Sequence, residues 1–138
     1  MMKHAAITVV ASLAIPLATP AKSDCLSYEP SRVSIQGALN RVIFPGPPNF
    51  QDVERGDKPE PYFVLQLQQP VCVDKGKYED EPSLSDILSI QLGLTGPQYS
   101  QFRSLLGKRV RLSGTLSAAT TGHHHTPVML GAVVLEEK

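Results

Sequence analysis

Three consecutive histidines, His123, His124 and His125, are the most chemically distinctive run in this 138-residue chain. Neutral imidazole is a good ligand for zinc, copper or nickel. If this run is extended, His123 and His125 point to one side and His124 points to the other. His123 and His125 could then chelate one zinc or copper ion, with a carboxylate as a further ligand. Two alternatives need no metal: the rings contact a ligand directly, or they hydrogen-bond carboxylates and backbone carbonyls and so fix their loop.

The carboxylates for either arrangement are expected from the segment between Pro45 and Pro61, which begins with a Pro-Gly-Pro-Pro run. Such a run cannot form a strand, and a loop of this length in a small domain is usually functional or disordered. Its four candidate acidic residues are Asp52, Glu54, Asp57 and Glu60. We expect Asp57, within Arg55-Gly56-Asp57, to accept hydrogen bonds from local backbone amides in a turn. The residues predicted to anchor the two loops are Asn49, Phe50, Thr121, Gly122 and Thr126.

The elements that must position these loops follow from the apolar pattern. Alternating residues predict five strands, over residues 32–44, 62–73, 87–94, 110–116 and 128–134. In the first strand the alternation shifts by one position, which predicts a β-bulge near Asn40-Arg41. Thr95-x-x-Gln98 is a capping box that predicts a helix, and Gly107 is expected to end it.

This order of elements predicts an all-β domain with little helix, an OB-type five-stranded barrel with one helix between strands three and four. An open α+β sheet with one covering helix is the competing interpretation. In an OB barrel the loop between strands one and two and the loop between strands four and five flank the usual binding face. The acidic segment and the histidines are therefore expected to meet at one pole of the barrel.

Residues 1–21 have the layout of a secretory signal peptide. Lys3 precedes an uncharged run of 14 residues, which is shorter than the roughly 20 that span a bilayer. We predict cleavage after Ala21, with cleavage after Ser23 as the second choice and an uncleaved anchor as the alternative. Residues 22–138 would then form one periplasmic or secreted domain with no membrane span.

Export places the two cysteines of the mature chain, Cys25 and Cys72, in an oxidising compartment, where a disulfide is expected. Cys25 precedes the first strand and Cys72 lies near the end of the second, and antiparallel neighbours would bring these ends together. Two free thiols or a metal site are the alternatives, although neither cysteine belongs to a C-x-x-C pair.

Composition narrows the function. The chain has 13 basic and 13 acidic residues and no tryptophan, so its composition does not indicate the basic groove with aromatic platforms that nucleic-acid binding needs. No nucleophile motif accompanies its serine, histidine and aspartate residues, so we do not expect an enzyme. The favoured prediction is a non-enzymatic binding module for a protein partner or an envelope ligand, without a cofactor. The alternative is a zinc- or copper-binding protein that uses the histidine run.

Two segments also carry a family resemblance. They are Gly107-Lys108-x-Val110-x-x-x-Gly114-x-Leu116 and Thr121-Gly122-His123-His124-His125-Thr126-Pro127-Val128, and Phe44–Phe50 with Gly56-Asp57 fits the same pattern. The chain resembles a bacterial family of small exported proteins, a domain of unknown function with this triple-histidine signature. The resemblance implies a periplasmic or secreted domain and implies no activity.

Overall fold

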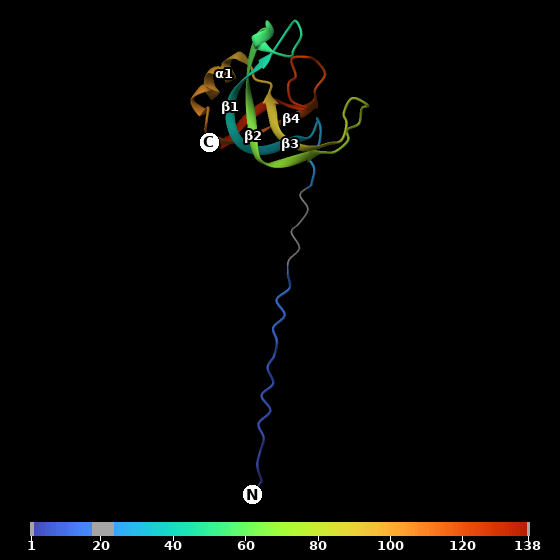
Figure 1. Ribbon diagram of the computed structural model, residues 1–138, viewed down its shortest axis with the longest axis vertical. Coiled ribbons are helices and arrows are strands. Elements are labelled where there is room, and N and C mark those ends of the chain that lie inside the picture. The colour runs from blue at the N-terminus through green and yellow to red at the C-terminus, as the bar shows by residue number, and fades with distance from the viewer. Residues whose placement is uncertain (1, 18–23, 138) are drawn as a thin grey trace.

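The computed structural model describes residues 2–17 and 24–137 (Figure 1). Residues 2–17 have no regular secondary structure and extend away from the strands. The two predicted cleavage positions, after Ala21 and after Ser23, lie outside the described residues. Within the described ranges, no helix has both the length and the apolar character needed to cross a membrane.

The described part of the chain folds into five strands, one α-helix and two short 3-10 helices. The strands are β1 (Arg32–Pro45), β2 (Pro59–Val73), β3 (Leu84–Leu92), β4 (Arg109–Ala118) and β5 (Val128–Glu137). The helices are η1 (Val53–Arg55), α1 (Gly96–Phe102) and η2 (Arg103–Leu105). A mostly β domain with a five-stranded sheet and one α-helix between the third and fourth strands is therefore confirmed.

The sheet closes on itself in the order β1-β2-β3-β5-β4. Closure is possible because β1 pairs with β4 along residues 32–38 and with β2 along residues 38–45. Gly37 lies near this change of partner, where a Cβ would collide with the carbonyl oxygen of Gln66, so only glycine fits there without a shift. β3 and β5 pair in parallel, and the remaining neighbours are antiparallel.

The core lies inside this closed sheet and follows the strand alternation. Val33, Ile35 and Leu39 of β1 point inward, as do alternate residues of β4 such as Leu112 and Leu116. Each such side chain, when fully buried, stabilises the folded domain by about 1.5–3 kcal/mol. Because closure leaves few strand edges exposed, a short chain can bury a core without a second sheet.

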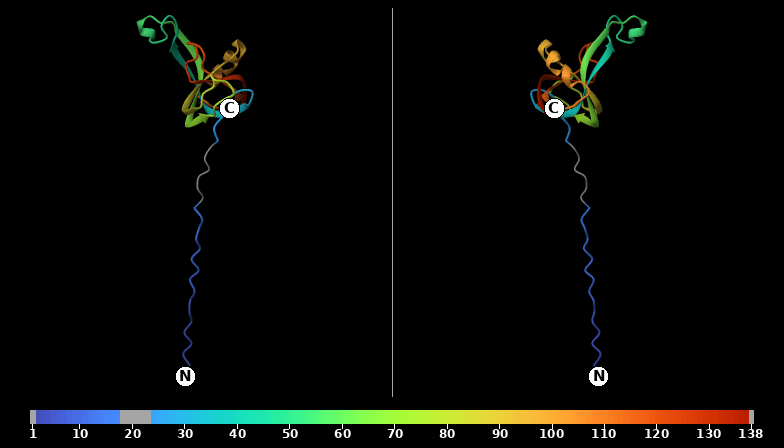
Figure 2. Two further views of the ribbon diagram at one scale, coloured as in Figure 1. Left: turned by 90° about the vertical axis from the view of Figure 1, so that its right-hand side faces the viewer. Right: turned by 90° about the vertical axis from the view of Figure 1, so that its left-hand side faces the viewer.

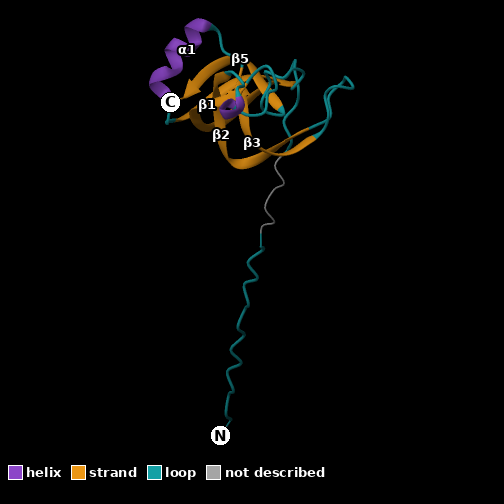
Figure 3. Cartoon of the chain, turned by 45° about the horizontal axis from the view of Figure 1, so that its top comes forward, coloured by secondary structure: helices purple, strands orange, loops and turns teal. Residues whose placement is uncertain are grey.

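Helix α1 lies outside the strands at one side of the domain (Figure 3). Its predicted capping box is confirmed: Gln98 N–H donates to Thr95 Oγ1, and Thr95 N–H donates to Gln98 Oε1. The Gln98 amide also donates to the Val133 carbonyl, which ties the first turn to β5. After η2 the chain turns at Gly107, whose φ of 81° favours glycine.

The predicted bulge in β1 is wrong. The register between β1 and β2 runs without a shift from Ala38↔Gln66 to Pro45↔Pro59. The apolar pattern changes phase because these strands continue past the closed sheet as a two-stranded ribbon, residues 41–45 and 59–63. Figure 2 shows the β1–β2 hairpin projecting beyond the other strands. The outer face of the ribbon is covered by another loop, so Val42 and Phe44 are half-buried there although no residue is inserted.

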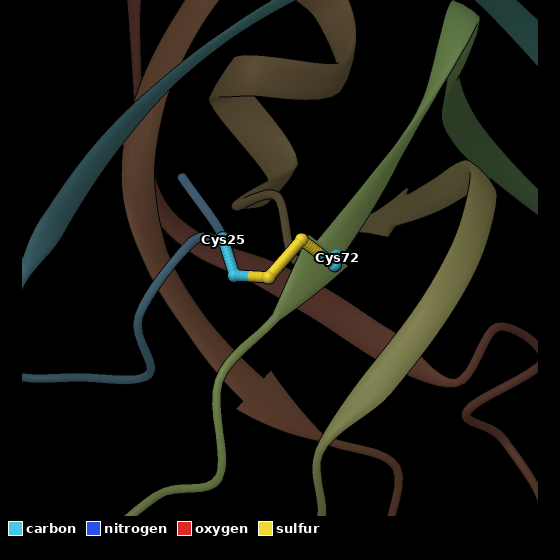
Figure 4. The surroundings of a disulfide bond; sticks show 2 residues. All are labelled: Cys25 and Cys72. Carbon is cyan, nitrogen blue, oxygen red and sulfur yellow. A yellow bond between two sulfur atoms is a disulfide. The ribbon is translucent and has the colours of Figure 1, made fainter. Parts of the chain in front are cut away.

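The disulfide between Cys25 and Cys72 is present, with Cα atoms 4.7 Å apart (Figure 4). It joins the segment before β1 to the end of β2, as predicted. Backbone hydrogen bonds continue the connection, because Leu26 N–H donates to the Cys72 carbonyl and Asp74 N–H donates to the Leu26 carbonyl. The residues leading into β1 are therefore held to β2 by covalent and hydrogen bonds.

Candidate functional site

One carboxylate binds two of the three histidines. Glu60, in the β1–β2 ribbon, places Oε1 2.6 Å from His123 Nδ1 and Oε2 2.9 Å from His125 Nε2. The ribbon and the loop between β4 and β5, residues 119–127, are thereby joined at one end of the closed sheet. We call Glu60, Gln91 and residues 119–127 the histidine pole.

Aromatic rings of the ribbon, and one from the loop between β1 and β2, pack against the same histidines. Phe44 stacks on His125 with ring centroids 4.5 Å apart and planes 1° from parallel. The ring centroids of Tyr62 and His125 are 5.7 Å apart, and Phe50 and His123 form a T-shaped pair with centroids 5.3 Å apart. These contacts fix the ring planes, so the nitrogens are aimed at Glu60 by packing as well as by hydrogen bonds.

Gln91 of β3 forms hydrogen bonds with the backbone of the histidine run. The residue is 2% exposed, its Nε2 donates to the His123 carbonyl at 3.1 Å, and its Oε1 accepts from His125 N–H at 2.8 Å. The backbone N–H of Gln91 donates to Thr126 Oγ1. The sequence analysis missed this residue. The available signal was a polar side chain between the apolar Ile90 and Leu92.

These contacts indicate which ring nitrogens donate to Glu60. Burial would raise the pKa of Glu60, but hydrogen bonds from His125 and His123 outweigh it and lower that pKa. An ionised carboxylate is acceptor-only, so His123 carries a proton on Nδ1 and His125 carries one on Nε2. His124 differs, because its Nδ1 accepts from the Thr120 backbone N–H at 3.0 Å.

The other three acidic candidates do not join the histidines. Asp57, 4% exposed, accepts hydrogen bonds from the backbone N–H groups of Asn49, Gln51 and Asp52. These bonds, led by that from Asp52, lower the pKa of Asp57. Asp52 caps η1 by accepting from Glu54 N–H, and Glu54 itself is exposed. Asp57 thus organises its own loop, as expected, and Glu60 alone among the four contacts a histidine.

The predicted loop anchors take several forms. Thr126 is buried, and its hydroxyl accepts from Gln91 N–H and donates to the Val128 carbonyl. Thr121 Oγ1 accepts from His123 N–H. A Cβ on Gly122 would lie 3.0 Å from the Phe50 ring, so glycine allows that ring to approach.

The histidine pole has the residue types of a transition-metal site, but its nitrogens and oxygens bind one another. Among residues 2–17 and 24–137, no group of three or more histidine, cysteine, aspartate or glutamate side chains is arranged to hold a metal ion. For His123 Nδ1 and His125 Nε2 to bind a metal, Glu60 would have to release both rings.

A shallow pocket of about 300 Å³ lies beside the histidine pole. It is bounded by β2, the end of β3, α1 and the histidine loop, and the side chains that line it include Tyr62, Gln91, Tyr99, His123, His124 and Met129. The pocket combines aromatic surface with imidazole and amide groups, as many ligand sites do. No nucleophile paired with a base is found among these side chains.

Comparison with known proteins gives one match. Residues 89–133 match the family model described as Domain of unknown function (DUF4431). This supports the predicted relation to a family of unknown function. No curated protein and no solved structure matches the chain.

The matched region has a clear place in the structure. It includes the end of β3 with Gln91, all of α1 and β4, the histidine loop and the first part of β5. Glu60 and the ribbon lie outside it. The matched region therefore supplies the histidines and their backbone support, and the rest of the chain supplies the carboxylate.

Proposed function

We propose that this chain is an exported, non-enzymatic binding module of OB type that engages a protein partner or an envelope ligand at the histidine pole. The observation that carries this proposal is that Glu60 joins the β1–β2 ribbon to the loop of residues 119–127 beside a pocket. A site held in place before binding loses less conformational entropy when its ligand arrives.

The OB assignment is supported by the closed strand order and by the position of α1 between β3 and β4. In OB folds, ligands bind a face flanked by the loop after the first strand and the loop before the last. Here the pocket beside the histidine pole contacts β2, the end of β3 and the loop before β5. This position of the pocket supports the proposal, because OB folds bind ligands on that face.

Site-specific photocross-linking tests the binding proposal. A photoreactive amino acid at Leu94, which lines the pocket and is half-buried, is compared with one at Gln69, which is exposed on β2 at a different hollow. Intact cells of the source organism should give a discrete adduct at position 94 and none at position 69. Excess unlabelled chain should suppress that adduct. Absence of an adduct at position 94, or the same adducts at both positions, would contradict the proposal.

Export is tested separately. Fractionated cells should contain the mature form outside the cytoplasm, beginning at Lys22 or Asp24 by intact mass. A chain found at full length from Met1 in the cytoplasm would contradict export. The disulfide agrees with an oxidising compartment, where such bonds persist.

A further inference from the structure

A second hollow lies on the opposite face of the β1–β2 ribbon from the histidine pole. Its volume is about 480 Å³, and it separates the ribbon from α1 and η2. The side chains that line it are Arg41, Pro61, Phe63, Tyr99, Arg103 and Leu106. We call it the arginine hollow.

The hollow exists because the inward face of the sheet continues past the point of closure. Arg41 pairs with Phe63 and Ile43 pairs with Pro61, so these four residues share one face of the ribbon. With an unbroken register, this is the face that buries Leu39 inside the closed sheet. Beyond closure its cover is incomplete, and Ile43 is 53% exposed.

The floor of the hollow is aromatic. Phe63 is buried, and its ring meets that of Tyr99 edge to face, with centroids 4.9 Å apart and planes 67° apart. Leu106 and Pro61 add apolar surface on the two sides. Such a floor favours a flat apolar group, which gains from burial and from contact with the rings.

The walls carry positive charge from two separate elements. Arg41 extends from β1 and Arg103 from η2, and no acidic side chain lines the space between them. Within the described residues, neither arginine forms an ion pair or a side-chain hydrogen bond with a protein group. Their guanidinium groups are free to bind a carboxylate through paired N–H donors.

We propose that the arginine hollow binds an aromatic carboxylate, whose ring lies on Phe63 and Tyr99 and whose carboxylate is held by Arg41 and Arg103. The size of the hollow is within the range of small-molecule sites. This site is distinct from the pocket at the histidine pole, although Tyr99 lines both. It does not depend on the function proposed for that pole.

The test is a titration of the mature, oxidised chain with 2-naphthoate. Binding is measured from the changes in amide chemical shift in NMR spectra. A ligand of about 13 heavy atoms at ordinary ligand efficiency gives a Kd of about 1 mM or below. The largest shifts should map to residues 41–43, 61–63 and 99–106. The neutral analogue 2-naphthamide should bind about tenfold more weakly, because it lacks the charge that the arginines recognise.

Matched variants separate specific recognition from general attraction to positive charge. Arg41→Gln and Arg103→Gln should each raise the Kd for 2-naphthoate about threefold or more, while Arg109→Gln should leave it unchanged. Arg109 is a suitable control because it is exposed on β4 and does not line the hollow. All three side chains are exposed, so thermal unfolding should confirm that each variant is folded.

Three results of the titrations would overturn the proposal, and a fourth concerns where the shifts lie. They are equal affinity for the carboxylate and the amide, no saturable shifts at about 10 mM naphthoate, and equal effects of Arg109→Gln and Arg41→Gln. Shifts confined to residues 119–127 would also overturn it and would instead place the ligand at the histidine pole. The photocross-linking test detects contacts at Leu94, in the pocket beside the histidine pole. Either proposal can therefore fail while the other holds.

Discussion

The two hydrogen bonds to Glu60 should differ in strength, because their surroundings differ. The His125 side chain is 9% exposed and the Glu60 side chain is 14% exposed, whereas the His123 side chain is 54% exposed. Buried hydrogen bonds to a charged group contribute about 1.5–3 kcal/mol, and exposed ion pairs contribute about 0.2–1 kcal/mol. We therefore expect the Glu60–His125 contact to stabilise the domain more than the Glu60–His123 contact.

Double-mutant cycles measure each contact separately. Glu60→Ala is combined with His125→Phe in one cycle and with His123→Phe in the other, and each free energy of unfolding is obtained from urea titration at pH 7. Phenylalanine keeps a ring against Phe44 or Phe50 and removes the nitrogen that binds Glu60. The expected coupling energy is about 1.5–3 kcal/mol for His125 and below about 1 kcal/mol for His123.

A matched control excludes a general effect of losing a negative charge. Glu54→Ala removes an exposed carboxylate that lies outside the histidine pole, so its effect should stay within about 0.5 kcal/mol. If the two couplings were equal, or if His123 gave the larger one, burial would not decide the strength of these bonds. Two couplings near zero would show that the pole is held by ring stacking and Gln91.

Three further predictions concern stability. Replacing both Cys25 and Cys72 with Ala should lower the free energy of unfolding by about 4 kcal/mol. This value comes from the chain-entropy relation for a loop with a sequence separation of 47. A loss below about 1 kcal/mol, measured by urea titration, would contradict it. Asp57→Asn should destabilise the domain at pH 7. Since the pKa of Asp57 is lowered on folding, its contribution is complete above the ordinary value of 3.8 and is lost as the pH falls through the folded value, so the difference between wild type and variant should narrow in acid. A constant difference from pH 7 to about pH 2 would refute this linkage. Added zinc should not raise the Tm of the wild type, because Glu60 already holds both rings; a rise that Ala replacement of His123–His125 abolishes would restore the metal hypothesis.

Local patterns in the sequence predicted local features of the structure. The capping box at Thr95, the end of the helical segment at Gly107 and the strand alternation all depend on residues a few positions apart. The Cys25–Cys72 bond was predicted correctly, but the expected antiparallel contact between the start of β1 and the end of β2 is not what brings the cysteines together. The start of β1 pairs with β4, and a parallel bridge between Leu26 and Val73 holds the segment before β1 to the end of β2. Asp57 could be assigned to its turn because the backbone N–H groups that donate to it belong to residues within eight positions of it.

Features that depend on distant contacts were harder to predict. Gln91 bonds residues 32 and 34 positions away, so its role depends on the parallel pairing of β3 with β5. The phase shift in β1 indicated a bulge because a sequence shows which residues are apolar but not what covers them. A strand with an inserted residue and a ribbon covered on its outer face give the same pattern. The choice of Glu60 among four carboxylates likewise depends on the β1–β2 register, which places it opposite Phe44.

The ribbon explains why two different kinds of surface lie so close together. In an antiparallel pair, successive side chains point to opposite faces, so each strand contributes alternately to each surface. Glu60 and Tyr62 face the histidine loop, whereas Pro61 and Phe63 face the arginine hollow. A shift of one residue in the β1–β2 register would turn Glu60 away from the histidines and bring Phe63 toward them. Both proposed sites therefore depend on the same register, and the stacking of Phe44 on His125 helps to hold it.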